Sequence, residues 1–406
     1  MANDVRVVIT GMGMISSLGY NLKENWNNLC EGKNGIKNIS SFDTSKLDTK
    51  FAAEVDSSIV DEKVKELFIR REYKQMTKNT RMGVISTCEA IEASGLDKVD
   101  MDMTRVAVIM GVVSTNNNSM NPKPKSNFIV KTMPNAISAW TTIKYGFEGP
   151  NFNVSSACAS SAYAIVLGQY LIRSGLVDVA IVGGADASVE EQYIQGFNQI
   201  LALSTRNEEP ETACRPFCVS RDGFVMGEGA GTLVLENYEF AKNRDAKIYG
   251  QLLGSAFTSE AGDITAPKKD GVGMAETMEI AMKDAGICYD SVDYINAHGT
   301  STYLNDKYET MAIKSLFKDR QSKINISSTK SMLGHTIAAC SAIEGIVTVM
   351  SLKNGVITPT INHIDPDEEL DLNYTPNVKV FRNINIALSN SFGFGGHNGC
   401  LILKKY

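Results

Sequence analysis

Short apolar segments rich in β-branched residues alternate along the whole chain with longer segments of helical pattern. Strands that are buried on both faces of a sheet read as continuous hydrophobic runs, whereas half-exposed strands alternate between apolar and polar residues. The runs predicted as strands are residues 6–10, 105–113, 177–185, 231–236, 292–297 and 384–391. Their alternation with helical segments predicts an α/β fold.

The same succession of elements occurs twice. In the first half, the strand at 105–113 ends in a polar loop, and residues 151–162 then lead into an apolar helix. In the second half, the strand at 292–297 ends in a Ser/Thr-rich loop, and residues 324–342 lead into another apolar helix. This repetition predicts two similar halves that each contribute to one shared site.

The length and composition agree with two such halves. A chain of 406 residues with 43% hydrophobic residues has enough apolar material for two core-sized units. We expect the first half to cover residues 1–250 and the second to cover residues 251–406.

The net charge and the arrangement of the cysteines argue against nucleic-acid-binding, membrane and disulfide-rich secreted proteins. The net charge of −6 argues against binding to nucleic acid or to an anionic membrane surface, because such binding needs a basic surface. The N-terminal residues do not read as a basic leader followed by an apolar run, and no apolar run approaches the roughly 20 residues of a membrane span. Eight cysteines without a disulfide-like framework fit a reducing compartment. We expect a cytoplasmic protein.

Cys158 lies in the stretch SSACASSA, among small residues at the predicted start of the first apolar helix. Unpaired N–H groups and the positive end of the helix dipole would favour a thiolate there and lower the pKa of the thiol. The same N–H groups could hold an oxyanion, and Asn153, Ser155 or Ser156 could cap the helix. Two interpretations follow: Cys158 is a nucleophile, or it is a small buried hydrophobic residue.

Two of the four histidines, His298 and His335, lie in similar Gly/Ser/Thr-rich turns. His335 opens the second apolar helix, whose N-terminus would keep the imidazole neutral and able to donate a hydrogen bond. That helix carries one carboxylate, Glu344, which needs a partner if it is buried. Lys330 is the nearest candidate for that partner.

Glycine-rich and cysteine-rich segments suggest neither a nucleotide site nor a metal site. Residues 11–19 lack the spacing of a phosphate-binding loop, and residues 227–231 precede a strand instead of opening a helix. Cys214 and Cys218 have no second Cys or His pair nearby, so no metal is expected. The glycine-rich turn at 393–399 follows a strand and could supply a backbone N–H to a reacting oxygen.

Five motifs together carry a resemblance that covers the chain from VVITGMG to its C-terminus. In order, they are SSACASSA, RDGFVMGEGAG, NAHGTST, TKSMLGH and NSFGFGGHNG. Their order and spacing resemble those of the β-ketoacyl-[acyl-carrier-protein] synthases, and most of all the elongating synthases of type II systems. The resemblance implies the thiolase fold, in which duplicated α/β halves form a five-layer αβαβα arrangement.

The resemblance also implies a reaction, the decarboxylative Claisen condensation of an acyl chain with malonyl-acyl carrier protein in fatty-acid elongation. Cys158 would be the acylated nucleophile, and His298 and His335 would bind the malonyl thioester carbonyl and promote loss of CO₂. Lys330 and Glu344 would form a supporting charge pair. Such chemistry needs two neutral N–H donors for the enolate oxygen and a separate acceptor thioester.

Other positions follow from the same resemblance. The N–H groups of Cys158 and Phe394 would form the oxyanion hole, and Phe394 would also gate the acyl pocket. Thr300 and Thr302 would contact the pantetheine arm. No cofactor is expected in the chain itself, because the partner acyl carrier protein carries the phosphopantetheine.

The expected partner is an acidic acyl carrier protein, loaded with acyl or malonyl groups. Its docking patch should be basic, and Arg70, Arg71, Lys74 and Arg206 match the docking positions of the family. The resemblance further implies a dimer, formed either by two copies of the chain or with a related ketosynthase-like subunit.

The chain departs from the family pattern at several places. The region between Gly111 and Gly149 is shorter than usual and carries a polar loop at 115–127, while Tyr303 and His397 stand where Pro and Thr are common. These departures leave open a ketosynthase of a type II polyketide or polyene pathway that works with a related subunit. A non-catalytic chain-length partner is a further alternative, although such partners lack the nucleophilic cysteine. A cysteine hydrolase would not explain the second histidine.

Overall fold

The computed structural model describes residues 5–114 and 127–406, so most of the polar loop at 115–127 lies outside the described residues. The strands are β1 (Val7–Ser16), β2 (Lys37–Asn38), β3 (Phe51–Ala52), β4 (Val106–Gly111), β5 (Asn151–Val154), β6 (Val179–Asp186), β7 (Gly229–Asn237), β8 (Gly250–Ser259), β9 (Tyr294–Asn296), β10 (Asn325–Ser327), β11 (Val356–Ile357), β12 (Val380–Phe381), β13 (Ile386–Gly393) and β14 (His397–Lys404).

The α-helices are α1 (Leu22–Cys30), α2 (Ser57–Leu67), α3 (Arg70–Tyr73), α4 (Lys78–Ser94), α5 (Phe128–Thr132), α6 (Ala136–Tyr145), α7 (Ser160–Arg173), α8 (Glu191–Gln199), α9 (Tyr238–Asn243), α10 (Val272–Asp284), α11 (Tyr303–Phe317), α12 (Lys330–Leu333) and α13 (Cys340–Asn354). Short 3-10 turns connect several of them.

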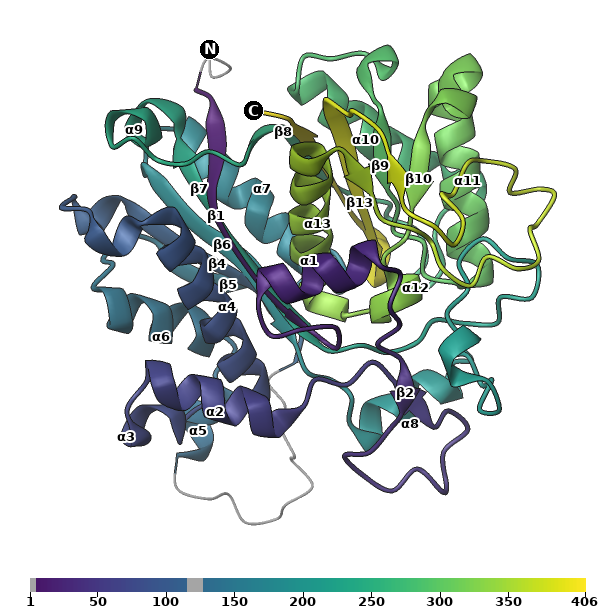
Figure 1. Ribbon diagram of the computed structural model, residues 1–406, viewed down its shortest axis with the longest axis horizontal. Coiled ribbons are helices and arrows are strands. Elements are labelled where there is room, and N and C mark those ends of the chain that lie inside the picture. Colours follow the sequence, from purple (N-terminus) through teal and green to yellow (C-terminus); the bar gives the residue numbers. More distant parts are fainter. Residues whose placement is uncertain (1–4, 115–126) are drawn as a thin grey trace.

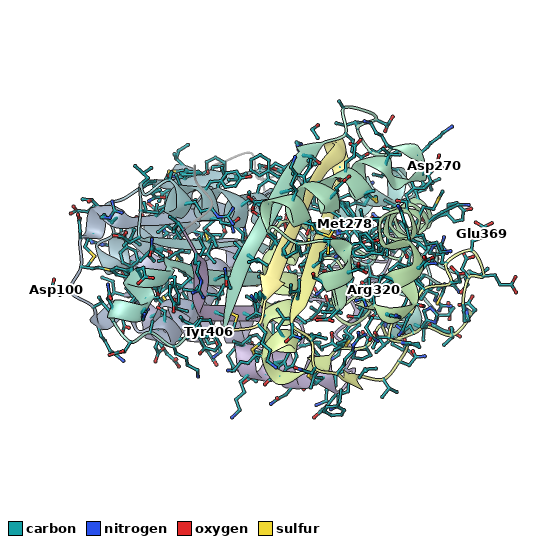
Figure 2. The ribbon with its side chains drawn as sticks, turned by 90° about the horizontal axis from the view of Figure 1, so that it is seen from above. Asp100, Asp270, Met278, Arg320, Glu369 and Tyr406 are labelled. Atoms are coloured by element: carbon teal, nitrogen blue, oxygen red, sulfur yellow. The ribbon has the colours of Figure 1, made fainter. Side chains whose placement is uncertain are left out.

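Ten strands form one continuous mixed sheet in the order β10-β9-β13-β14-β8-β1-β7-β6-β4-β5. The five strands that each half gives to this sheet can be numbered first to fifth along the chain. From the outer edge to the middle, both halves then follow the order third, second, fourth, fifth, first. The two halves join where Val7–Ile9 of β1 pair with Gly250–Leu252 of β8. The predicted duplication is therefore confirmed. Figure 2 shows the halves side by side, with Asp100 and Glu369 at opposite ends of the molecule.

The two halves of the sheet form two β layers, with helices between these layers and outside them (Figure 1). The first apolar helix, α7, packs on β4 and β6, while α13 contacts both β7 of the first half and β13 of the second. These two helices also contact each other and form the central layer. Helix α4 covers β1 and β7 from outside, and α10 covers β8 and β14. The result is the predicted five-layer αβαβα arrangement.

Glycine allows the first-half helix to approach its sheet closely. A Cβ atom at Gly111, the last residue of β4, would lie 2.5 Å from the backbone nitrogen of Ser161 in the first turn of α7. Such a distance is far below van der Waals contact, so only glycine permits this packing. The start of α7 is therefore held against the carboxyl end of β4, which is where the site forms.

The two apolar helices begin differently from the prediction. Helix α7 starts at Ser160 with Ala159 at its N-cap and no side-chain capping bond, so the predicted cap by Asn153, Ser155 or Ser156 is wrong. His335 does not open α13 directly, because a 3-10 turn at Ile337–Ala339 intervenes. The N-cap residues of both helices, Ala159 and Ala339, make no side-chain capping bond, and both helix starts are buried between the halves.

Among the described residues, one helical stretch, Ile337–Asn354, is long and apolar enough to cross a membrane by length and composition. It is 83% buried inside the protein. That burial is typical of a core helix, and it agrees with the place of α13 in the central layer.

Candidate active site

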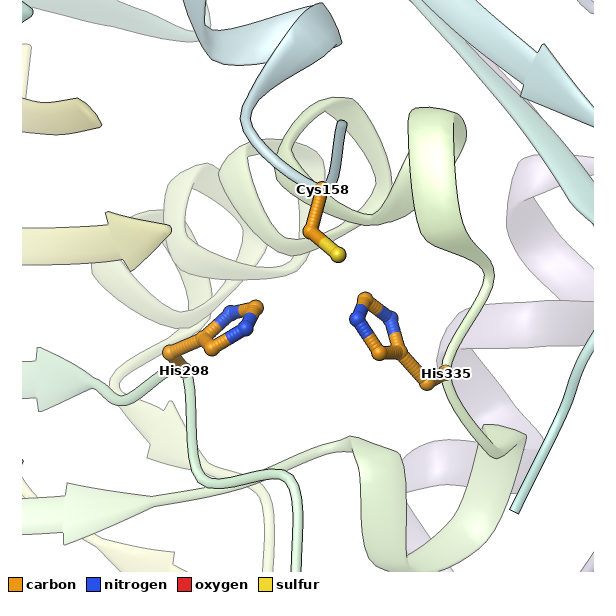
Figure 3. A group of neighbouring side chains, drawn as sticks. All are labelled: Cys158, His298 and His335. Carbon is orange, nitrogen blue, oxygen red and sulfur yellow. The ribbon is translucent and has the colours of Figure 1, made fainter. Parts of the chain in front are cut away.

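Cys158, His298 and His335 come together from three separate segments (Figure 3). Cys158 lies in the turn before α7, His298 follows β9, and His335 follows α12. Their side-chain ligand atoms all lie within 4.8 Å of one another. The two imidazole rings meet edge to face, with centroids 5.2 Å apart. The structure thus brings the three predicted residues into one group.

These residues lie in a cavity of about 590 Å³. Apolar side chains, among them Phe197, Phe224, Ile337 and Phe392, form much of its lining. Cavities of this size with an apolar lining and a few convergent polar groups are typical of small-molecule sites. The cavity therefore suits an apolar chain whose reactive end reaches Cys158.

The thiol of Cys158 is protonated at neutral pH. Desolvation raises its pKa to about 12, while the charge of Lys330 and hydrogen bonds from the backbone N–H groups of Phe394 and Cys158 act in the opposite direction. The predicted lowering of this pKa is therefore wrong for the resting protein, because loss of hydration outweighs the helix N-terminus. A thiol in this state has to lose its proton before its sulfur can act as a nucleophile.

The N–H groups of Phe394 and Cys158 point at the same sulfur. Glycine at position 393 favours this geometry, because a Cβ there would make a tight contact of 3.0 Å with the backbone nitrogen of Cys158. Phe394 itself is 37% exposed and lines the cavity. Two N–H groups that converge beside a thiol form the donor arrangement that an oxyanion needs.

Both imidazoles are neutral. The rings of His298 and His335 are buried, and burial lowers the pKa of each well below its usual value. The positive charge of Lys330 lowers both pKa values further. The lowered pKa of His335 agrees with the predicted neutral ring, and burial and Lys330 are its physical causes.

Lys330 and Glu344 form a buried ion pair. The ammonium nitrogen of Lys330 lies 2.5 Å from Oε1 of Glu344, and both side chains are 2% exposed. Burial acts to lower the pKa of Lys330, but the negative groups around it, with Glu344 first, raise its pKa overall. Lys330 therefore stays charged, and it provides the positive potential that keeps both imidazoles neutral.

Glu309 belongs to the site but was missed in the sequence. This residue of α11 is fully buried, and its carboxylate accepts hydrogen bonds from the backbone nitrogens of His298 and Gly299, each at 2.9 Å. It also accepts from Asn390. Glu309 thereby fixes the turn that presents His298. A carboxylate in the helix that follows NAHGTST was the available signal.

Thr300 and Thr302 line the cavity, and their hydroxyl oxygens are 2.8 Å apart. The four predicted docking residues lie outside the cavity lining. Arg70, Arg71 and Lys74 are exposed on and beside the four-residue helix α3. The fourth, Arg206, donates to the carbonyl of Ser220 and lies 3.5 Å from Asp222.

The donor atoms at the site could also suit a metal ion by type. One cysteine and two histidines are ligands that zinc prefers, and a second group is formed by His298, Cys340 and Glu344. The buried ammonium of Lys330 opposes another cation here, because it already disfavours protonation of both imidazoles. That the site works without a metal stays a prediction.

Comparisons with known proteins now identify the family. The model for the N-terminal domain of β-ketoacyl synthases matches residues 4–241, and the model for the C-terminal domain matches residues 249–363. The chain belongs to the β-ketoacyl synthase family. Members of this family are acyl-transferring condensing enzymes, and the predicted enzyme class is confirmed.

Curated relatives agree along the full length of the chain. The 3-oxoacyl-[acyl-carrier-protein] synthase 2 of Vibrio harveyi is 38% identical over 412 residues, which cover 98% of each chain. The synthase of the same name from Staphylococcus aureus strain MRSA252 is 38% identical over 417 residues, which cover all of both chains.

Solved structures confirm the thiolase-type fold. A β-ketoacyl synthase from Burkholderia phymatum superimposes with a TM-score of 0.90 at 31% identity, covering 99% of this chain and all of that one. The ketosynthase in a complex with its type II polyketide acyl-carrier protein superimposes with a TM-score of 0.89 at 31% identity, covering 99% of both chains.

Proposed function

We propose that the protein extends an acyl chain by two carbons in fatty-acid elongation, with Cys158, His298 and His335 as the catalytic residues. The observation that carries this proposal is the convergence of a cysteine and two neutral imidazoles within 4.8 Å in an apolar cavity. A hydrolase needs only one such imidazole, whereas decarboxylation followed by condensation uses two neutral donors and a nucleophile.

In the first step, the sulfur of Cys158 attacks the thioester of an acyl-acyl carrier protein. The N–H groups of Cys158 and Phe394 hold the developing oxyanion, and the carrier protein leaves as a free thiol. The thiol proton of Cys158 is thereby passed to the leaving thiolate. The acyl chain then lies in the apolar cavity, with Phe394 at its entrance.

In the second step, malonyl-acyl carrier protein occupies the vacated thioester position. His298 and His335 donate hydrogen bonds to the thioester oxygen, and the C–C bond to the carboxylate breaks with loss of CO₂. The resulting carbanion attacks the acyl-cysteine carbonyl. The C–S bond breaks, the Cys158 thiolate takes up a proton, and a β-ketoacyl-acyl carrier protein is released.

The remaining residues act around this chemistry. Glu344 keeps Lys330 charged, and the positive charge of Lys330 keeps the imidazoles neutral. Thr300 and Thr302 bind the pantetheine arm. Arg70, Arg71, Lys74 and Arg206 dock the acidic carrier protein, whose phosphopantetheine is the only prosthetic group the reaction uses. We further propose a dimer, a cytoplasmic location, and halves that meet between residues 250 and 251.

A second candidate function keeps the reaction and changes the pathway. The likeness to a type II polyketide ketosynthase at a TM-score of 0.89 favours a ketosynthase subunit that works with a related partner. Such a subunit would accept chains that carry unreduced keto groups or double bonds. The non-catalytic alternative is disfavoured, because the nucleophilic cysteine is present and reaches the cavity.

Intact-protein mass spectrometry tests the proposal. The protein is incubated with carrier proteins that bear saturated, unsaturated or β-keto chains, and then with malonyl-acyl carrier protein. Wild type should gain one acyl group that malonyl carrier protein discharges, and Cys158→Ala should gain none. Cys288→Ala is the matched control, because Cys288 is exposed and outside the cavity lining. An adduct that persists in Cys158→Ala would contradict the proposal.

A further inference from the structure

The carbonyl oxygen of the nucleophile is held by two side chains from the other half of the molecule. The thiol of Cys340 donates to the oxygen of Cys158 at 3.2 Å, and the hydroxyl of Ser341 donates to the same oxygen at 3.3 Å. Both residues belong to the first turn of α13 and are buried. The turn that presents the nucleophile is therefore tied directly to the start of this helix.

One more bond joins the same two turns. The backbone nitrogen of Ala342 donates to the hydroxyl of Ser161 at 3.0 Å. Ser161 lies in the first turn of α7, so three hydrogen bonds connect the starts of the two central helices. The half that supplies both histidines thus also fixes the position of the cysteine.

The backbone around Cys158 is strained, which makes such support necessary. Ala157 has a φ of +49°, in the left-handed region that non-glycine residues rarely adopt. Residues held in this region cost about 1–3 kcal/mol and persist only where the surroundings enforce them. Within the turn, the carbonyls of Ser156 and Ala157 accept from the nitrogens of Ala159 and Ser160. The carbonyl of Cys158 instead points to α13.

We propose that Cys340 and Ser341 are positioning residues that hold the Cys158 carbonyl so that its N–H and its sulfur face the cavity. The inference rests on the proposed function and adds two residues to it. Neither is among the residues that line the cavity. They act through the orientation of the Cys158 peptide and touch no substrate.

The two half-reactions separate this role from a general structural one. Acyl transfer uses the sulfur and the N–H of Cys158, whereas decarboxylation of malonyl carrier protein depends on the N–H donors of His298 and His335. A misplacement of about 1 Å at a reacting group can cost about 100-fold in rate. Loss of the two donors should therefore slow acyl transfer and leave decarboxylation nearly unchanged.

The test compares the rate of Cys158 acylation with the rate of malonyl decarboxylation. Acylation is followed by rapid-quench mass spectrometry, and decarboxylation by CO₂ release in a Cys158→Ala background. We expect Cys340→Ala combined with Ser341→Ala to slow acylation about 10- to 100-fold. Ser341→Ala alone should also slow acylation, and it should change decarboxylation less than about twofold. Cys340→Ser and Ser341→Thr keep a donor and should restore most of the acylation rate.

Ser341→Ala alone is the cleanest single variant. The sulfur of Cys340 also lies within 4.8 Å of a His298 ring nitrogen, so its replacement could disturb the histidine as well. A parallel fall of both rates in Ser341→Ala, or no rescue by Ser341→Thr, would overturn the positioning role. Acylation at the wild-type rate in the double variant would overturn the inference alone. Wild type that is never acylated would overturn the proposed function together with it.

Discussion

At the scale of single residues, burial sets the protonation states of the site. The cavity removes water from Cys158, His298 and His335, and in each case desolvation is the largest cause of the pKa shift. Burial disfavours the charged form of every group, so the cysteine remains a thiol and the histidines remain neutral. A neutral imidazole can donate to an enolate oxygen without first losing a proton.

The histidine protonation states predict the pH dependence of decarboxylation. A histidine of ordinary pKa near 6.5 would be half protonated at that pH. Because the pKa values of His298 and His335 lie well below it, their neutral forms persist as the pH falls through this range. CO₂ release by the Cys158→Ala variant should stay level from about pH 8 to about pH 6. A fall by half near pH 6.5 would contradict this account.

At the scale of elements, α12 and α13 carry a charged pair into the core. Lys330 begins α12 and Glu344 lies one turn inside α13, so the pair links two segments that are separated by the His335 turn. Removal of one partner from a buried pair leaves an uncompensated charge and costs about 3–5 kcal/mol. Each charge of the pair therefore requires the other, in addition to the effect of Lys330 on the two imidazoles.

A double-mutant cycle measures the interaction energy between Lys330 and Glu344. Lys330→Met and Glu344→Gln should each lower the free energy of unfolding by about 3–5 kcal/mol, and the double variant should lose clearly less than their sum. Urea denaturation gives these values. The exposed pair of Lys307 and Glu369 is the matched control, and Lys307→Met should have a much smaller effect. Additive losses at Lys330 and Glu344 would show that the two charges do not interact.

The sequence pattern predicts these elements unequally. Strands that are continuous apolar runs, such as β4 and β6, were found because they are buried on both faces. Strand β8, with the sequence GQLLGSAFTS, was missed because its glycines and polar residues interrupt the run. The two histidine turns and Cys158 were recognised from local motifs. Glu309 and the Cys340–Ser341 contact depend on how distant segments meet, which local patterns do not contain.

At the scale of the whole molecule, the duplicated sheet brings residues from both halves to one cavity. The chain carries a net charge of −6, yet Arg70, Arg71 and Lys74 form a small exposed basic group on the first half. Opposite charges steer association and depend on ionic strength, even when the total charge of a protein is unfavourable. An acidic carrier protein would meet this group before its prosthetic arm enters the cavity.

Charge reversal tests this docking surface. Arg70→Glu combined with Arg71→Glu should raise the KM for acyl-carrier protein about 10-fold at low salt, with a smaller effect at high salt. Steady-state kinetics should show an unchanged rate with an acyl-pantetheine that has no carrier protein. Lys318→Glu combined with Lys323→Glu, on the exposed surface of the second half, is the matched control. Equal effects of the two charge changes would contradict a specific docking site.

The central claim is that one cavity joins an acyl group on Cys158 to a carbanion made from a malonyl thioester. Its most direct test is a single turnover of preformed acyl-enzyme with malonyl-acyl carrier protein, in which lost acyl-enzyme, released CO₂ and β-ketoacyl product are measured together. We expect the three quantities to be equal, and His298→Ala to abolish CO₂ release and product formation together. Loss of the acyl group as free acid, without CO₂ release or a β-ketoacyl product, would show hydrolysis and contradict the account.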